Sequence, residues 1–136
     1  MPTITTLADV NRKRRQQQQS INEIKTFERA ADVRASYYAL PQWKSLRKEY
    51  RRLHPLDELS LLSDVIEAAE DVHHLISPFE YGHNAAEITL LLLDADNLIS
   101  LTKLHHGYIH ANRAALSDME KDYLNERISA VKSKYQ

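Results

Sequence analysis

The sequence predicts an all-α protein, a four- to five-helix antiparallel bundle or helical-hairpin array with a basic N-terminal arm. Three observations lead to this prediction. The chain has only two glycines and four prolines in 136 residues, and good helix formers dominate the remainder. Apolar residues recur every three or four positions over most of its length. It contains no Asn-Gly or Asp-Gly hairpin signal and no run with strand-like alternation.

The first predicted helix runs from about residue 7 to residue 40. From Ile21 onward its apolar positions have helical spacing, and they are Ile21, Ile24, Phe27, Ala31, Ala35 and Tyr38. Upstream, residues 11–19 are basic and rich in glutamine, so they offer little to bury. We therefore expect residues 1–20 to be a basic, Gln-rich arm or a frayed helix start, and residues 21–136 to form a single helical domain.

Two prolines open the next two predicted helices, because proline tolerates the first helical position. Pro41 starts a helix over about 42–53, which needs packing by Trp43 and Tyr50 because an isolated helix of this length is marginal in water. Pro55 starts a third helix that extends to residue 76. Its apolar face consists of Leu59, Leu62, Ile66, Ala69, His73 and Ile76. The clearest loop follows, at residues 77–82.

The fourth predicted helix supplies much of the core. It starts near Asn84 and reaches at least His105, and its apolar face consists of Ile88, Leu92, Ala95 and Ile99. At Gly107 the helix kinks or ends, or it continues beyond. Ser117 followed by Glu120 is a capping-box pattern, which predicts the start of a last helix.

Several function classes are excluded by composition. The absence of cysteine excludes disulfides, zinc–thiolate sites, iron–sulfur clusters and thiol nucleophiles. The N-terminus lacks the apolar core of a signal peptide, and the longest apolar run of four residues, as at 90–93, is far shorter than the roughly 20 residues that span a bilayer. We therefore expect a cytoplasmic protein without a membrane partner. With no Gly-rich phosphate loop and no complete catalytic motif, we expect neither enzymatic activity nor a cofactor.

Two groups of residues are candidate metal sites if the third and fourth helices run antiparallel on either side of the 77–82 loop. The first group is His73, His83 and Glu87. The second group is His54, His106 and His110. Three nitrogen or oxygen ligands plus water form a plausible zinc set, and imidazole also suits iron, copper and nickel. The alternative, which we favour at this point, is that these histidines cap the core and hydrogen-bond to their neighbours.

Two spaced pairs resemble a known metal-binding pattern. His83-x-x-x-Glu87 and His106-x-x-x-His110 are similar to two of the metal-binding pairs of hemerythrin-type helical bundles, over about 28 residues of the chain. The resemblance implies a metal site inside a helical bundle. The chain departs from the family pattern because its last helix contains no histidine, so we do not carry the family's function over.

Charge is divided unevenly along the chain. The net charge of −1 combines +7 over residues 1–54 with −8 over residues 55–136. The cations that we expect to form an interaction surface are Arg12, Arg14, Arg15, Lys44, Arg47, Lys48, Arg51 and Arg52. The two halves could neutralise each other within one chain or between neighbouring copies.

These observations predict a non-enzymatic protein–protein interaction or assembly subunit. It would self-associate or dock on a partner through its oppositely charged halves, as a ring, connector or adaptor subunit does. Nucleic acid is the alternative partner, because the cations of residues 12–52 can contact phosphates and the aromatic residues between them can stack on bases. A histidine-based metal-binding helical bundle is the third possibility.

Overall fold

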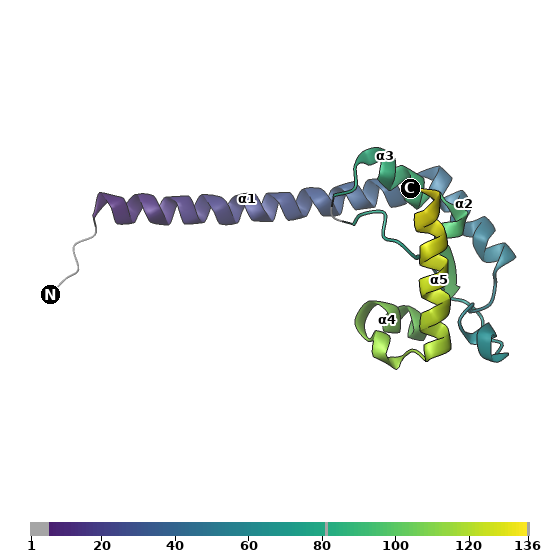
Figure 1. Cartoon of the computed structure of the whole chain (residues 1–136). Helices are drawn as coiled ribbons and strands as arrows, with labels where there is room; N and C mark the ends of the chain where they lie inside the picture. Colours follow the sequence, from purple (N-terminus) through teal and green to yellow (C-terminus); the bar gives the residue numbers. More distant parts are fainter. Residues whose placement is uncertain (1–5, 81, 136) are drawn as a thin grey trace. The chain divides into compact units, whose positions relative to one another are not determined.

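The structure, a computed structural model, describes residues 6–80 and 82–135, except for the side chains of residues 23–29. It divides the chain into two compact units, Met1–Ala39 and Leu40–Gln136 (Figure 1). The chain is mostly helical and contains a small two-stranded sheet, which confirms the predicted helical class in its coarse form. Among the described residues, none of the helices combines the length and the apolar character that crossing a membrane requires.

The first unit contains helix α1 (Leu7–Tyr38), which confirms the range of the first predicted helix. A capping box starts it, since the Thr6 hydroxyl accepts the N–H of Asp9 at 3.2 Å and the Asp9 carboxylate accepts the N–H of Thr6. The Gln-rich stretch 11–19 therefore lies inside a helix. None of the described side chains of α1 is buried; the side chains of Ile24 and Phe27, which belong to the predicted apolar face, lie outside the described part.

The second unit begins with helix α2 (Pro41–Leu53), with proline at its first position as predicted. Trp43 and Tyr50 are buried, with 4% and 6% of their surface exposed, and this confirms that packing holds the helix. The Tyr50 hydroxyl lies 2.9 Å from the carbonyl oxygen of Leu98, 48 residues away, so α2 contacts the sheet as well as the core.

The prediction of a helix over residues 55–76 is wrong. This segment contains a short 3₁₀ turn, η1 (Ser60–Ser63), and strand β1 (Asp71–His74). The carboxylate of Asp57 accepts the N–H of Ser60 at 2.7 Å, which caps the 3₁₀ turn, and the N–H of the distant Thr102 at 2.6 Å, which ties residue 57 to a remote segment of the chain. Asp64 then ends the turn in the left-handed region, at φ 58°, which a helix cannot continue through.

The continuous helix predicted from Asn84 to His105 is also absent from this part of the chain. Asn84 does cap helix α3 (Ala85–Leu92), but the chain then forms a 3₁₀ turn, η2 (Ala95–Asn97), and strand β2 (Leu98–Leu101). The interruption has a tertiary cause. The buried side chain of Asn97 donates to the carbonyl oxygens of Ile76 and Leu91 and accepts the N–H of Ile76, which fixes the chain in a bend.

Two helices and a turn complete the chain. Helix α4 (Lys103–Ala111) contains Gly107 in its interior, so neither a kink nor an end is needed there. A 3₁₀ turn, η3 (Arg113–Ala115), leads to helix α5 (Asp118–Lys134). The capping box of Ser117 and Glu120 starts α5, as predicted.

The antiparallel pair β1–β2 takes the place of the expected helical hairpin. Asp71 lies opposite Leu101 and His73 lies opposite Ile99, so these four side chains share one face of the sheet. Helix α4 contacts both strands, and so does α2. Because successive strand residues alternate between faces, His74 lies on the opposite face from His73, where it stacks on Trp43 of α2.

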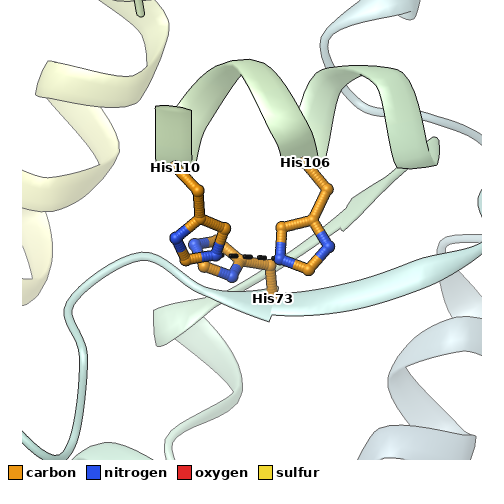
Figure 2. A group of neighbouring side chains, drawn as sticks. All are labelled: His73, His106 and His110. Atoms are coloured by element: carbon orange, nitrogen blue, oxygen red, sulfur yellow. Dashed lines mark hydrogen bonds between the residues drawn. The ribbon is translucent and has the colours of Figure 1, made fainter. Parts of the chain in front are cut away.

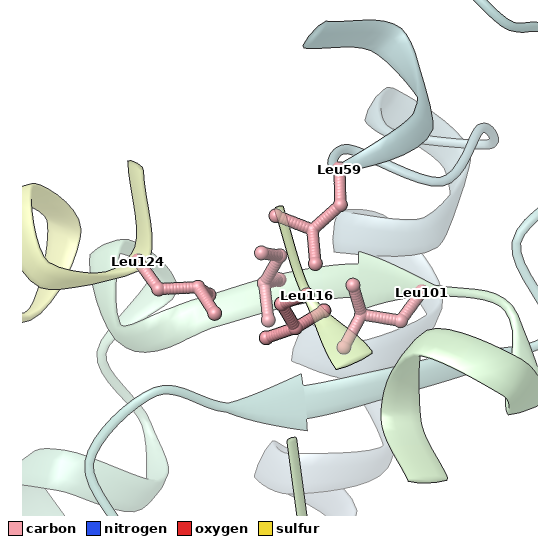
Figure 3. Close-up of a cluster of buried hydrophobic side chains, with 5 residues drawn as sticks. Leu59, Leu101, Leu116 and Leu124 are labelled. Atoms are coloured by element: carbon pink, nitrogen blue, oxygen red, sulfur yellow. The ribbon is translucent and has the colours of Figure 1, made fainter. Parts of the chain in front are cut away.

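The hydrophobic core lies on the same face of the sheet as Ile99 and Leu101. It brings together buried residues from the start of η1 (its N-cap), from β2, from α5 and from the loop before α5, namely Leu59, Ile99, Leu101, Leu116 and Leu124 (Figure 3). Each of these five side chains is at most 4% exposed. The core thereby fixes the sheet and α4 against each other, which sets the geometry of the histidines described next.

Candidate functional site

Three histidines from separate parts of the sequence meet between strand β1 and helix α4 (Figure 2). His73, His106 and His110 each offer one ring nitrogen, and these three nitrogens all lie within 4.8 Å of one another. Each pair of rings has a centroid separation of 4.7 Å. We call these three residues the histidine cluster.

Local structure explains how the cluster forms. Alternation along β1 puts Asp71 and His73 on the face that also carries Ile99 and Leu101. Helix α4 starts directly after β2, where the Thr102 hydroxyl accepts the N–H of His105. His106 and His110 are one helical turn apart on α4, so both rings reach toward His73.

A carboxylate orients one ring of the cluster. Nδ1 of His106 lies 2.9 Å from Oδ2 of Asp71, which favours the tautomer that carries its proton on Nδ1. Nε2 of His106 then keeps a free electron pair, and it lies 2.9 Å from Nε2 of His110, which donates to it. This inferred protonation leaves the electron pair of His106 directed into the cluster.

His73 is the most enclosed member of the cluster. Burial lowers the pKa of His73 to about 3, and the positive charge of Arg113, together with that of His106, His110 or His74 whenever they are protonated, acts in the same direction. The ring is therefore neutral at pH 7. Among the described residues it makes ring contacts with His106 and His110 and no hydrogen bond.

Two histidines of the cluster, His73 and His106, are each next in sequence to a histidine with a different role. His74 stacks on Trp43 at 4.6 Å between ring centroids, and its Nε2 donates to the carbonyl oxygen of Leu92. His105 lies between Asp57, 2.8 Å from its Nδ1, and Glu120, 3.1 Å from its Nε2. These two histidines join secondary-structure elements, whereas His73 and His106 turn toward each other.

The structure groups the predicted metal ligands differently from the sequence analysis. His54, expected beside His106 and His110, instead stacks on Tyr50 with 4.4 Å between ring centroids. The expectation assumed a helical hairpin that brings residues 54 and 106 to one level. With two short strands in that place, His73 is the residue that joins His106 and His110.

The other predicted group, His73 with His83 and Glu87, also separates. Nδ1 of His83 bonds to the carbonyl oxygen of Pro78 at 3.0 Å. Glu87 caps the N-terminus of α3 by accepting the N–H of Asn84, so the hemerythrin-like spacing of His83 and Glu87 reflects a helix start. Asp71 was not among the predicted site residues, because a spacing of two places Asp71 and His73 on one face only in a strand, and a helix was expected here.

The predicted basic surface divides between the two units. On α1, Arg14 and Arg15 are exposed, and Arg12 pairs with Asp9 at 3.1 Å. On α2, all five predicted cations are exposed, and they are Lys44, Arg47, Lys48, Arg51 and Arg52.

Two of these α2 cations, both arginines, have partners within the second unit. Arg51 donates to the carbonyl oxygen of Ala69, and Arg52 pairs with Glu49 at 2.6 Å. The aromatic residues of this helix, Trp43 and Tyr50, are buried and therefore cannot stack on bases, which removes one support for a nucleic-acid partner.

An acidic stretch contrasts with the basic N-terminal half. Residues 53–102 contain ten Asp and Glu residues and no Lys or Arg. Within it, residues 61–70 expose the carboxylates of Asp64, Glu67 and Glu70 beside the apolar side chains of Val65 and Ile66. We call residues 61–70 the acidic segment.

A cavity of about 430 Å³ lies beside α2 and α5, and three of its polar residues, Tyr50, Glu58 and Arg127, are hydrogen-bonded in one network. The Tyr50 hydroxyl donates to Glu58 at 2.6 Å, and Arg127 donates to Glu58 and to the carbonyl oxygen of Leu98. Burial and the adjacent Glu58 carboxylate raise the pKa of Tyr50, so its hydroxyl stays protonated. This network joins α2, α5 and the sheet.

None of the protein-family models, curated proteins and solved structures that were compared with the chain matches it. Its function is therefore inferred from the chemistry and geometry of its own residues. Two features stand out: the exposed basic helix α1 and the histidine cluster.

Proposed function

We propose that the protein is a non-enzymatic assembly subunit that self-associates head to tail, with helix α1 of one copy docking on the acidic segment of the next. One observation carries the proposal: α1 extends over 32 residues, and none of its described side chains is buried. Most helical stability in proteins comes from packing of a helix face and not from propensity. A helix of this length whose described side chains are all outside a core is therefore expected to gain stability from a partner.

Exposed apolar side chains on α1 support this proposal. Leu7 is 76% exposed, Ile21 44% and Val33 46%. The acidic segment carries exposed apolar side chains of its own, with Ile66 at 76% and Val65 at 44%. Contact between the two would remove apolar surface from water on both sides, at roughly 25 cal/mol per Å².

Charge supports the same pairing. Helix α1 has seven Lys and Arg residues and four Asp and Glu residues, so its net charge is +3. Residues 40–136 have eleven Lys and Arg residues and fifteen Asp and Glu residues, so their net charge is −4. Opposite charges steer docking and fix its register more than they add affinity.

Such a contact joins two different surfaces of identical copies. A heterologous contact of this kind closes into a ring when its rotation permits, and otherwise continues as a filament. The mass of the assembly therefore distinguishes a closed ring, which has one defined mass, from a filament, which has a broad distribution.

The proposal is tested by native mass spectrometry and light scattering of the full chain over a range of salt concentrations. We expect multiples of the 15.8 kDa subunit at low salt and smaller species as salt rises, because exposed charges are screened within about 8–10 Å at physiological ionic strength. The double variant Arg14→Glu/Arg15→Glu should shift the assembly toward the monomer. Adding Glu67→Lys and Glu70→Lys to that variant should restore association, because the charges are then exchanged between the two surfaces.

The control is Lys132→Glu, which reverses an exposed charge on α5 and should leave the mass unchanged. A monomer at every salt concentration would contradict the proposal. So would a multimer that the Arg14→Glu/Arg15→Glu substitutions leave intact, because the contact would then lie elsewhere.

A further inference from the structure

We propose that His73, His106 and His110 bind one divalent transition-metal ion, that Zn²⁺ is the ion they suit best, and that Asp71 positions His106 as a ligand. The proposal is independent of self-association, because the histidine cluster and Asp71 lie entirely within residues 40–136. It rests on the convergence of three imidazoles from two secondary-structure elements, shown in Figure 2.

The donor set determines the class of ion. Three neutral imidazoles without a thiolate suit zinc, copper, nickel and iron, whereas magnesium and calcium require oxygen ligands. Zinc with three histidine ligands keeps its fourth position for water or another small ligand. His110 is exposed, so solvent reaches the cluster from that side and can supply the fourth ligand.

The spacing of the rings is close to what a metal requires. Ligands at about 2.05 Å from a tetrahedral ion are separated by roughly 3.3 Å. Nε2 of His106 and Nε2 of His110 are 2.9 Å apart, and the widest separation within the cluster is below 4.8 Å. Binding of an ion would therefore draw together the nitrogens that are farthest apart and separate Nε2 of His106 from Nε2 of His110 slightly.

Asp71 strengthens the assignment because its carboxylate holds the ring of His106, as carboxylates beside metal-binding histidines do in metalloproteins. A metal-binding histidine usually donates its other ring N–H to a carboxylate or carbonyl oxygen, which fixes the ring and its tautomer. Nδ1 of His106 donates to Asp71 at 2.9 Å, so Nε2 is the atom left for the ion. The negative charge of Asp71 also favours a cation at the cluster. The positive charge of Arg113 near His73 acts against it.

The test is isothermal titration of ZnCl₂ into the metal-free full chain. We expect one zinc per chain, and we expect His110→Ala to weaken binding at least 100-fold. Because His110 is exposed, this substitution should leave the fold intact, and circular dichroism checks that it does. Asp71→Asn should weaken binding by about 10- to 100-fold, as loss of a carboxylate that orients a metal-binding histidine typically does.

The matched control is His54→Ala, which removes an exposed histidine that stacks on Tyr50 and should leave zinc affinity unchanged. The variant Arg14→Glu/Arg15→Glu should bind zinc like the parent even where it no longer associates, which separates the two proposals. Failure of the parent to bind zinc stoichiometrically would overturn the inference. Equal binding by His110→Ala and the parent would overturn it as well.

Discussion

The carboxylate of Asp57 lies 2.8 Å from Nδ1 of His105, although the two residues are 48 positions apart in the chain. Asp57 is fully buried, and its oxygens also accept the N–H groups of Ser60 and Thr102 at 2.7 and 2.6 Å. One side chain therefore joins η1, the end of β2 and the start of α4. Since α4 carries His106 and His110, Asp57 also holds the candidate metal site in place.

Asp57→Ala should lower the free energy of unfolding by about 3–5 kcal/mol, because it leaves buried donors without an acceptor and His105 without one of its two carboxylates. Chemical denaturation of the full chain measures this loss. Asp122→Ala, at an exposed position of α5, is the control and should change stability by less than about 0.5 kcal/mol. A loss below about 1 kcal/mol for Asp57→Ala would show that the site tolerates the unpaired donors.

Acid should destabilise the protein in two stages. Burial lowers the pKa of His74 in the folded state. As pH falls from neutral toward that lowered pKa, His74 takes up a proton in the unfolded state but not in the folded state. Each such proton reduces the free energy of unfolding by about 1.4 kcal/mol per pH unit. Denaturation measured from pH 7.5 to 4.5 with a chelator present should show the decline, and His74→Phe should make it shallower. An identical slope in this variant would contradict the assignment.

The second stage of acid destabilisation involves Asp57. Burial raises the pKa of Asp57, but hydrogen bonds from Thr102, Ser60 and His105 outweigh burial and hold this pKa below its ordinary value. Its contribution is therefore present above about pH 4 and is lost as pH falls through the folded-state pKa. Extending the same denaturation series below pH 4 should show a further decline in the parent that is smaller in Asp57→Ala.

Asn97 fixes the bend that replaces the long helix. Its fully buried amide makes three hydrogen bonds, to the N–H and carbonyl of Ile76 and the carbonyl of Leu91. Asn97→Asp should cost about 3 kcal/mol or more at pH 7, because a buried carboxylate would face two carbonyl oxygens. Asn125→Asp, on the exposed surface of α5, is the matched control and should be nearly neutral in denaturant unfolding. Equal stability of the two variants would contradict this role of the Asn97 amide.

Trp43 holds α2 against the sheet by stacking on His74. Trp43→Ala should reduce the free energy of unfolding by about 3–5 kcal/mol, the range for removing a large aromatic side chain from a core. Lys44→Ala, at the adjacent exposed position, should remain within about 0.5 kcal/mol of the parent. If both variants unfold at the same denaturant concentration, α2 is not held by this contact.

The helices that sequence predicts correctly have signals within a few residues of their ends. Pro41 marks the start of α2, and Ser117 with Glu120 marks the start of α5. Proline geometry and capping hydrogen bonds act locally, so they operate whatever surrounds the helix. Asn84 marks the start of α3 for the same reason, but no local signal marked its end at Leu92.

The strands were missed because four residues are too few for a period to be read. Residues 71–74 and 98–101 also continue patterns with helical spacing, since Ile99 follows Ala95 and His73 follows Ala69 at the same interval. Their extended form depends on pairing with each other across the chain. The polar groups that interrupt the expected helices, Asp57 and Asn97, bind partners distant in sequence.

The candidate site likewise depends partly on local sequence signals and partly on long-range contacts. The sequence by itself determined that His106 and His110 form a pair, because a four-residue spacing places both on one helix face. Only the tertiary structure decided that His73 completes the cluster and that Asp71 orients His106. The physical reason is that helix capping and helix-face spacing are local, whereas strand register and buried polar contacts depend on segments brought together by the whole fold.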